Sequence, residues 1–268
     1  MNVAQYLPLV PEIEKKIVDN KLDSLVCGMG PTAWLLPYIQ RDLLAGLRLW
    51  GVHDGCRIMP MDDLVVMDTP INALHPDTKR HQHIIDARPK RVWVYYRAFE
   101  TWKKLLHPSM HSVTESVTWA VWNPDAIPWP DPRFKLVPPE GAELHTLAIS
   151  PTGTTTLAWR EGCRRIGVIG VDMVKGHHHT HKWGAGVGRF FAKCAEHAHE
   201  RGGCVLNLSP ITSLQEFAQW TPSESSSEPT HTSETQEPNS SSSTASESTA
   251  GDQTSKSRGC EAEKASGA

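Results

Sequence analysis

The sequence lacks the signatures of several large enzyme classes. Its six cysteines form no C-x-x-C pair, and no Walker A loop, G-x-S-x-G elbow or H-E-x-x-H motif occurs. These absences remove support for P-loop nucleotidases, α/β-hydrolases and zinc peptidases of the H-E-x-x-H type. Cysteines scattered without paired spacing indicate free thiols in a reducing compartment and argue against a disulfide scaffold.

Long hydrophobic runs and a large net charge are absent as well. No run reaches the ~20 residues that span a membrane, and the first residues lack the basic start and apolar core of a signal peptide. The chain holds 27 Lys and Arg against 30 Asp and Glu, and this near balance argues against a dedicated nucleic-acid binder. A local basic patch such as Arg88, Lys90 and Arg91 could still contact nucleic acid, although solvated faces carry such charges by default. We therefore expect a cytoplasmic protein without a membrane partner, in the host cytoplasm if a phage encodes it.

Apolar residues almost disappear from the last part of the chain. The segment 221–268 consists mainly of Ser, Thr, Glu, Pro, Gln and Gly. Such a segment cannot bury enough apolar surface to offset the entropy lost on ordering. We expect residues 221–268 to form a disordered tail and residues 1–220 to form one domain with its own core.

Short apolar runs alternate with helical patterns in residues 1–220. Strands are predicted at Ser24–Cys27, Leu47–Val52, Asp63–Met67, Arg91–Tyr95, Arg165–Gly170 and Cys204–Leu208, and helices at 10–22, 32–47 and 190–200. Pro37 is expected to interrupt the second helix. This alternation is typical of an α/β fold with a mostly parallel sheet and helices on both faces.

Two glycine-containing segments have the pattern of an anion site. Gly28-Met29-Gly30 follows the first strand, and Pro31 opens the next helical segment. Glycines let a ligand approach the backbone, and a helix N-terminus offers free N–H groups and a partial positive charge. The segment Pro151–Thr156, rich in hydroxyls, indicates a second loop and helix start. Asp68 ends the third strand on the ligand side of a parallel sheet, where it either lines the site or caps a turn.

Four histidines gather at His177, His178, His179 and His181. Imidazoles so close together can supply a base near neutral pH or metal ligands, and they can equally lie on an exposed loop without a role. Asp172 is a nearby carboxylate. A Mg²⁺ ion bound to a diphosphate would prefer Asp68 or Asp172 to imidazole.

Three blocks resemble sialyltransferase-like proteins and the MptE-like 6-hydroxymethylpterin diphosphokinases. Leu25–Thr32 is similar to their G-N-G-P-S block, with Met29 in place of Asn. Gly51–His53 followed by Asp63–Asp68 resembles G-V-N … P-D-Y-L-V-x-x-D, with His53 in place of Asn. Thr152–Asp172 resembles their S-G-x-x-A-L … G-x-D block. The resemblance covers about residues 22–215 and includes uncharacterised phage and bacterial proteins.

The resemblance implies a Rossmann-like nucleotide-binding fold and a set of site residues. The residues carried over for the donor nucleotide are Gly28, Met29, Gly30, Pro31 and Thr32 along the phosphates, Asp68 at the strand end, and Thr152, Gly153 and Thr154 as a second wall. His181 lies about where the bacterial sialyltransferases have a general base, with His179 as its rival, and Asp172 closes the third block. Segment 171–183 contains no Tyr, although those enzymes use tyrosines there on the leaving phosphate.

Three functions follow from these observations. The leading hypothesis is a glycosyltransferase-like transferase that uses a nucleotide or nucleotide-sugar donor and a His general base, with an acceptor that the sequence does not identify. The second is a diphosphokinase-like phosphoryl transfer with Mg²⁺ as the cofactor on Asp68 and Asp172. The third is a viral or bacterial protein that binds a nucleotide without catalysis.

Overall fold

The computed structural model describes residues 2–67, 80–122, 144–147, 150–173, 184–214 and 217. Contacts divide the chain into a compact unit, Met1–Ser223, and a second unit, Glu224–Ala268. The predicted tail, residues 221–268, lies outside the described residues. The fold is that of the first unit. In the described part, no helix combines the length and apolar composition needed to cross a bilayer.

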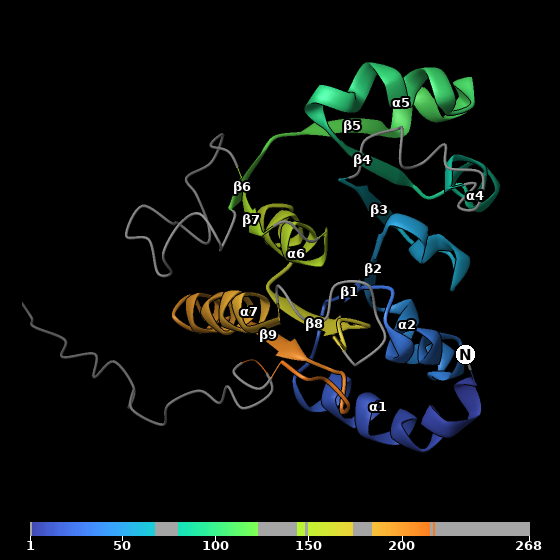
Figure 1. Ribbon diagram of the computed structural model, residues 1–268. Helices are drawn as coiled ribbons and strands as arrows, with labels where there is room; N and C mark the ends of the chain where they lie inside the picture. Colours follow the sequence, from blue (N-terminus) through green and yellow to red (C-terminus); the bar gives the residue numbers. More distant parts are fainter. Residues whose placement is uncertain are drawn as a thin grey trace, which may run out of the picture. The chain divides into compact units, whose positions relative to one another are not determined.

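A seven-stranded sheet lies at the centre of this unit (Figure 1). Its order is β5-β4-β3-β2-β1-β8-β9, and every neighbouring pair is parallel. The strands are β1 Ser24–Cys27, β2 Arg48–Val52, β3 Asp63–Val66, β4 Arg91–Tyr95, β5 Thr114–Val117, β8 Arg165–Ile169 and β9 Cys204–Asn207. A separate parallel pair is formed by β6 Trp119–Trp122 and β7 Leu144–Leu147. The predicted parallel α/β fold, which is Rossmann-like, is confirmed.

Helices connect the strands and cover the sheet. The α-helices are α1 Val10–Asp19, α2 Arg41–Ala45, α4 Arg80–Ala87, α5 Phe99–Leu105, α6 Ser150–Arg160 and α7 Gly184–His199. The 3-10 helices are η1 Val3–Leu9, η2 Pro31–Tyr38, η3 His53–Arg57, η4 Tyr96–Ala98 and η5 Pro108–Val113. The single helix expected over 32–47 is thus two, η2 and α2. Pro37 lies near the end of η2, and a proline inside an α-helix would remove a backbone hydrogen bond.

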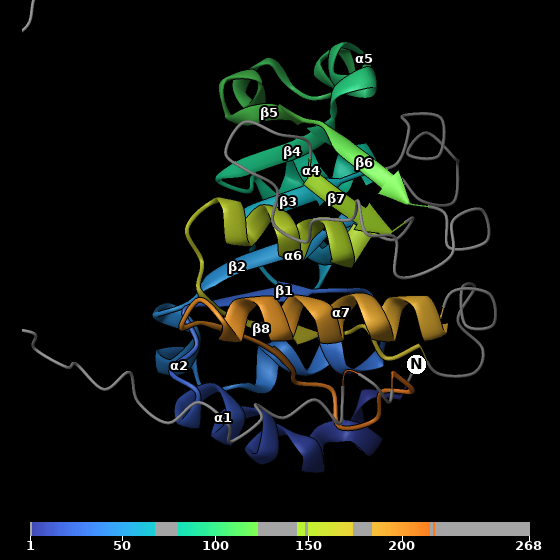
Figure 2. The same ribbon diagram turned by 90° about the vertical axis from the view of Figure 1, so that its left-hand side faces the viewer.

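The two faces of the sheet bury different side chains of the same strands. On one face, Val26, Val65 and Trp93 pack in one cluster with residues of α6 and α7, which lie in front of the sheet and roughly along its strands in Figure 2. On the other face, Leu25 packs with residues of α1, η2 and α2, and Leu64 with residues of α4 and α5. Successive strand residues point to opposite faces, and both faces are covered, so the middle residues of the central strands are apolar.

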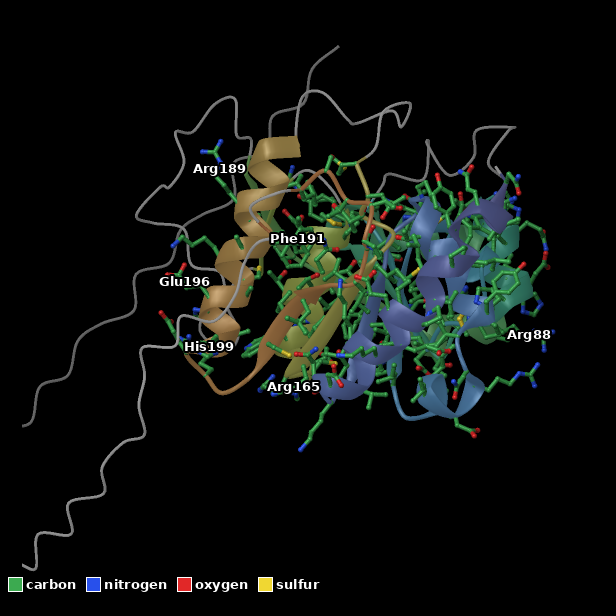
Figure 3. All side chains as sticks on the ribbon, turned by 90° about the horizontal axis from the view of Figure 1, so that it is seen from below. Arg88, Arg165, Arg189, Phe191, Glu196 and His199 are labelled. Atoms are coloured by element: carbon green, nitrogen blue, oxygen red, sulfur yellow. The ribbon has the colours of Figure 1, made fainter. Side chains whose placement is uncertain are left out.

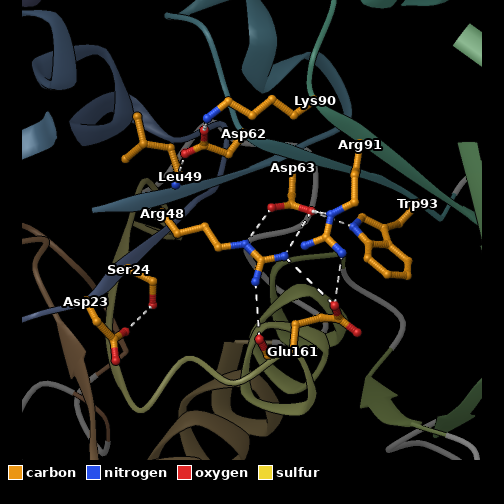
Figure 4. A network of polar contacts seen from close by, with 10 residues as sticks. All are labelled: Asp23, Ser24, Arg48, Leu49, Asp62, Asp63, Lys90, Arg91, Trp93 and Glu161. Carbon is orange, nitrogen blue, oxygen red and sulfur yellow. Dashed lines mark hydrogen bonds and ion pairs between the residues drawn. The ribbon is translucent and has the colours of Figure 1, made fainter. Parts of the chain in front are cut away.

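A charged network joins the amino ends of the central strands to the end of α6 (Figure 4). Asp63 accepts from Arg48 Nε at 2.7 Å, Arg91 Nε at 2.8 Å and Trp93 Nε1 at 2.8 Å. Arg91 Nη1 also donates to Glu161 Oε2 at 3.1 Å, just after α6. Burial raises the pKa of Asp63, against the lowering influence of Trp93 and Arg48. Because α6 ends at this edge, it must begin at the opposite edge, where the strands have their carboxyl ends.

Candidate functional site at the carboxyl edge of the sheet

The strand order reverses between β1 and β8. After β1 the chain continues through η2 and α2 to β2, whereas the helix after β8 is α7 on the opposite face. In open α/β sheets, ligands bind outside the carboxyl ends of the strands at such a reversal. The segments there are Gly28–Thr32 after β1, Gly170–Asp172 after β8, and His53 after the neighbouring β2.

The glycine turn after β1 packs directly against the turn after β8. The Gly28 N–H donates to Ile169 O at 2.8 Å, and the Gly30 N–H donates to Gly170 O at 2.7 Å. A Cβ on Gly28 would collide with Gly170 O, and one on Gly30 would lie 2.6 Å from Asp172 Oδ2. The glycines are therefore needed for the close approach of two protein segments, and the N–H groups predicted for a phosphate have internal partners.

Asp172 is the polar centre of this contact. Its carboxylate is 1 % exposed. Oδ2 accepts from the Thr32 N–H at 2.8 Å, and Oδ1 accepts from the Thr32 hydroxyl at 2.6 Å and from the Ser209 hydroxyl. The Thr32 hydroxyl in turn accepts from the Gly170 N–H at 3.0 Å. Asp172 thus supplies the negative charge that the start of η2 favours, and it holds the two turns together.

The remaining residues of the first block are apolar or buried. Met29 is half-buried and packs against the apolar cluster on the α1 side of the sheet, and Pro31 is buried at the start of η2. Burial and the charge of Asp172 raise the pKa of Cys27. The Cys27 side chain is buried and packs in the apolar cluster on the α1 side of the sheet.

The second predicted wall lies inside a helix, not in a loop before one. Thr152, Gly153 and Thr154 belong to the buried first part of α6. The Thr154 hydroxyl donates to Ser150 O at 2.8 Å, and the Thr155 hydroxyl donates to Pro151 O at 2.9 Å. These hydroxyls are used along the helix, so a ligand at this end would meet mainly the backbone and the first residue, Ser150.

His53 and Ser150 form a polar pair that sequence reasoning did not identify as a site. His53 Nε2 is hydrogen-bonded to Ser150 Oγ across 97 residues of sequence, at the carboxyl end of β2 and the start of α6. His53 has φ +47°, a left-handed conformation that is uncommon for a residue with a side chain. The available sequence signals were the position of His53 directly after a strand and that of Ser150 before a proline at a helix start.

Three predicted site residues lie outside the described residues: Asp68, His179 and His181. In the described part, no group of three His, Cys, Asp or Glu residues could hold a metal ion. Asp172 has both carboxylate oxygens engaged by protein donors, so the described residues do not fit the Mg²⁺ expected there.

Comparisons with known proteins identify no relative of this chain. No family model, curated protein or solved structure matches the chain. The resemblance to sialyltransferase-like and MptE-like proteins therefore stays a prediction. The fold and the geometry of the carboxyl edge are the basis on which a function can be proposed.

Proposed function

We propose that the chain is a transferase that binds a nucleotide-activated donor at the carboxyl edge of the sheet, with the donor phosphate beside His53 and the first turn of α6. The observation that carries this proposal is the hydrogen bond between His53 and Ser150. It brings an imidazole to the start of a helix of 11 residues, close to the reversal of strand order.

A helix start and an imidazole together suit a phosphate. The first N–H groups of a helix have no partners within the helix, and its N-terminus carries a partial positive charge. An imidazole N–H can donate a hydrogen bond to a phosphate oxygen, and His53 would exchange its contact with Ser150 for this one when the donor binds. We place the phosphate here and not on Gly28–Thr32, because the N–H groups of Gly28, Gly30 and Thr32 donate to protein oxygens.

The proposed reaction is displacement at the anomeric carbon of the donor. The acceptor hydroxyl attacks this carbon, and the bond to the phosphate oxygen breaks with its electron pair on the leaving nucleotide. His53 and the start of α6 stabilise the charge that develops on the phosphate. His181, or its rival His179, takes the proton of the acceptor hydroxyl. The diphosphokinase alternative has less support, because it needs Asp172 as a Mg²⁺ ligand.

Thermal unfolding of the full chain with nucleotides tests the binding step. We expect at least one nucleoside mono- or diphosphate among those of C, U, A and G to raise the midpoint without Mg²⁺, because a ligand of the folded state stabilises it. His53→Gly should weaken this nucleotide roughly tenfold, the loss expected for one hydrogen bond to a charged group. Glycine accepts the left-handed backbone of His53, so folding is preserved.

Lys21→Gly is the matched control, because Lys21 is an exposed residue with the same φ of +47°. It should bind the nucleotide like the wild type. Midpoint shifts that require ATP and Mg²⁺ would favour the diphosphokinase alternative, and no shift with any nucleotide would contradict the proposed site. If the chain binds the nucleotide but releases none from the corresponding nucleotide sugar, the result would indicate a binding protein and not a transferase.

A further inference from the structure

A pocket lies at the amino edge of the sheet, opposite the candidate site. It has a volume of about 650 Å³ and is lined by the connection from α2 to β2 and by the residues that lead into β3 and β4. This volume is within the range of small-molecule sites. Leu44, Leu47 and Met61 supply apolar lining, and Arg88 and Lys90 supply charged groups. The pocket is separate from the His53–Ser150 pair, which lies at the carboxyl ends of the strands.

The acidic side chains of this pocket are already paired. Asp62 accepts from Lys90 Nζ at 2.6 Å with one oxygen and from the Leu49 N–H at 2.9 Å with the other. Asp63 is held by Arg48 and Arg91 in the network of Figure 4. These contacts neutralise both acids of the lining and fix Lys90 at the pocket.

Among the described residues of the lining, Arg88 is the basic side chain without an acidic partner. It is exposed, and no ion pair joins it to another residue in the described part of the chain. Figure 3 shows it far from Arg189 of α7, on the other side of the sheet. Its φ is +47° and its N–H donates to Ile84 O at 3.1 Å, so it occupies the position after α4 where glycine is usual.

We propose that this pocket binds a small organic oxyanion, with the anionic group on Arg88 and the organic body on Leu44, Leu47 and Met61. A guanidinium presents its N–H groups as a planar fork that matches the oxygens of a phosphate or a carboxylate. The apolar lining removes the organic body from water. The proposal does not depend on the transferase function.

Isothermal titration calorimetry of the full chain with phenyl phosphate tests this site. Benzoate and inorganic phosphate are the other probes. Phenyl phosphate should bind the wild type, and Arg88→Gly should weaken it roughly tenfold. Glycine relieves the left-handed conformation, so the loss cannot be attributed to unfolding. Inorganic phosphate should bind more weakly than phenyl phosphate, because it lacks the apolar body. Benzoate against phenyl phosphate distinguishes a carboxylate from a phosphate as the preferred anion.

One variant serves as the matched control. Lys21→Gly removes an exposed positive charge from a residue with the same φ. It should bind phenyl phosphate within about twofold of the wild type, well below the cost of a lost charged hydrogen bond. Failure of the wild type to bind, equal binding by Arg88→Gly, or an equal loss in Lys21→Gly would overturn the proposal. Equal affinity for inorganic phosphate would overturn the role of the apolar lining.

Discussion

At the scale of single residues, Asp172 has structural contacts that its sequence context did not predict. Its position after a buried strand and before four histidines indicated catalysis or metal binding. In the structure it accepts three hydrogen bonds from Thr32 and Ser209 and is almost fully buried. Thr32 and Asp172 are 140 residues apart, so no local pattern reveals that they are partners.

Replacement of Asp172 should therefore destabilise the fold. Asp172→Ala leaves the Thr32 N–H and two hydroxyls without their acceptor, and we expect a loss of about 3 kcal/mol in the free energy of unfolding. Asp172→Asn keeps the volume and one acceptor oxygen and should lose less. Urea denaturation measures both. The control is Asp19→Ala, which removes an exposed ion pair with Lys15; an Asp172→Ala variant as stable as this control would contradict the structural role.

At the scale of elements, α7 combines an apolar face with a histidine beside it. Phe190, Phe191 and Cys194 pack against the sheet, and Phe191 stacks on Phe217 with ring centroids 4.9 Å apart. His197 Nδ1 accepts from Arg201 Nη1 at 2.9 Å. Burial lowers the pKa of His197, and the positive charge of Arg201 adds to this effect. The helix therefore favours the neutral imidazole.

This lowered pKa predicts a pH dependence of stability. Below the ordinary value of 6.5, the unfolded chain binds a proton at His197 more readily than the folded chain, so stability should fall as the pH falls from 6.5 toward the lower folded pKa. His197→Gln should remove this part of the loss, measured as the difference in unfolding midpoint between pH 7 and pH 5.5. His199→Gln, at an exposed histidine of the same helix, should lose stability with acid like the wild type. Equal acid sensitivity of the His197→Gln variant would refute the assignment.

At the scale of the whole molecule, one parallel sheet separates two polar regions. The carboxyl edge holds the His53–Ser150 pair and the Thr32–Asp172 contact, and the amino edge holds the Asp63 network and the Arg88 pocket. Because α6 runs between the edges on one face, its start contributes to the first region and its end to the second. The two proposed sites can therefore be tested independently.

Removal of the last residues should leave this sheet intact. The compact unit ends at Ser223, and the segment after it has almost no apolar residue that could contribute to a core. A chain that stops after Ser223 should have the thermal midpoint of the full chain, measured by circular dichroism. A clearly lower midpoint would show that the tail contributes to the stability of the fold.

Local pattern predicted a part of the elements of this protein. The runs Ser24–Cys27 and Arg91–Tyr95 were predicted with the bounds that the structure has, since a parallel strand covered on both faces is mostly apolar. The helical pattern over 10–22 likewise predicted α1, whose buried residues are Ile13 and Ile17. Both are properties of neighbouring residues, which the sequence contains in full.

Only the tertiary structure decided which segments meet. The positions of β8 beside β1 and of α6 across the sheet bring Asp172 to Thr32 and His53 to Ser150. Strand order and helix placement depend on the packing of the whole domain, and a hydrogen bond across 97 or 140 residues leaves no periodic signal. For this reason the sequence located the edge of the sheet at which a ligand is expected, whereas the pairing of His53 with Ser150 became visible only when the chain was folded.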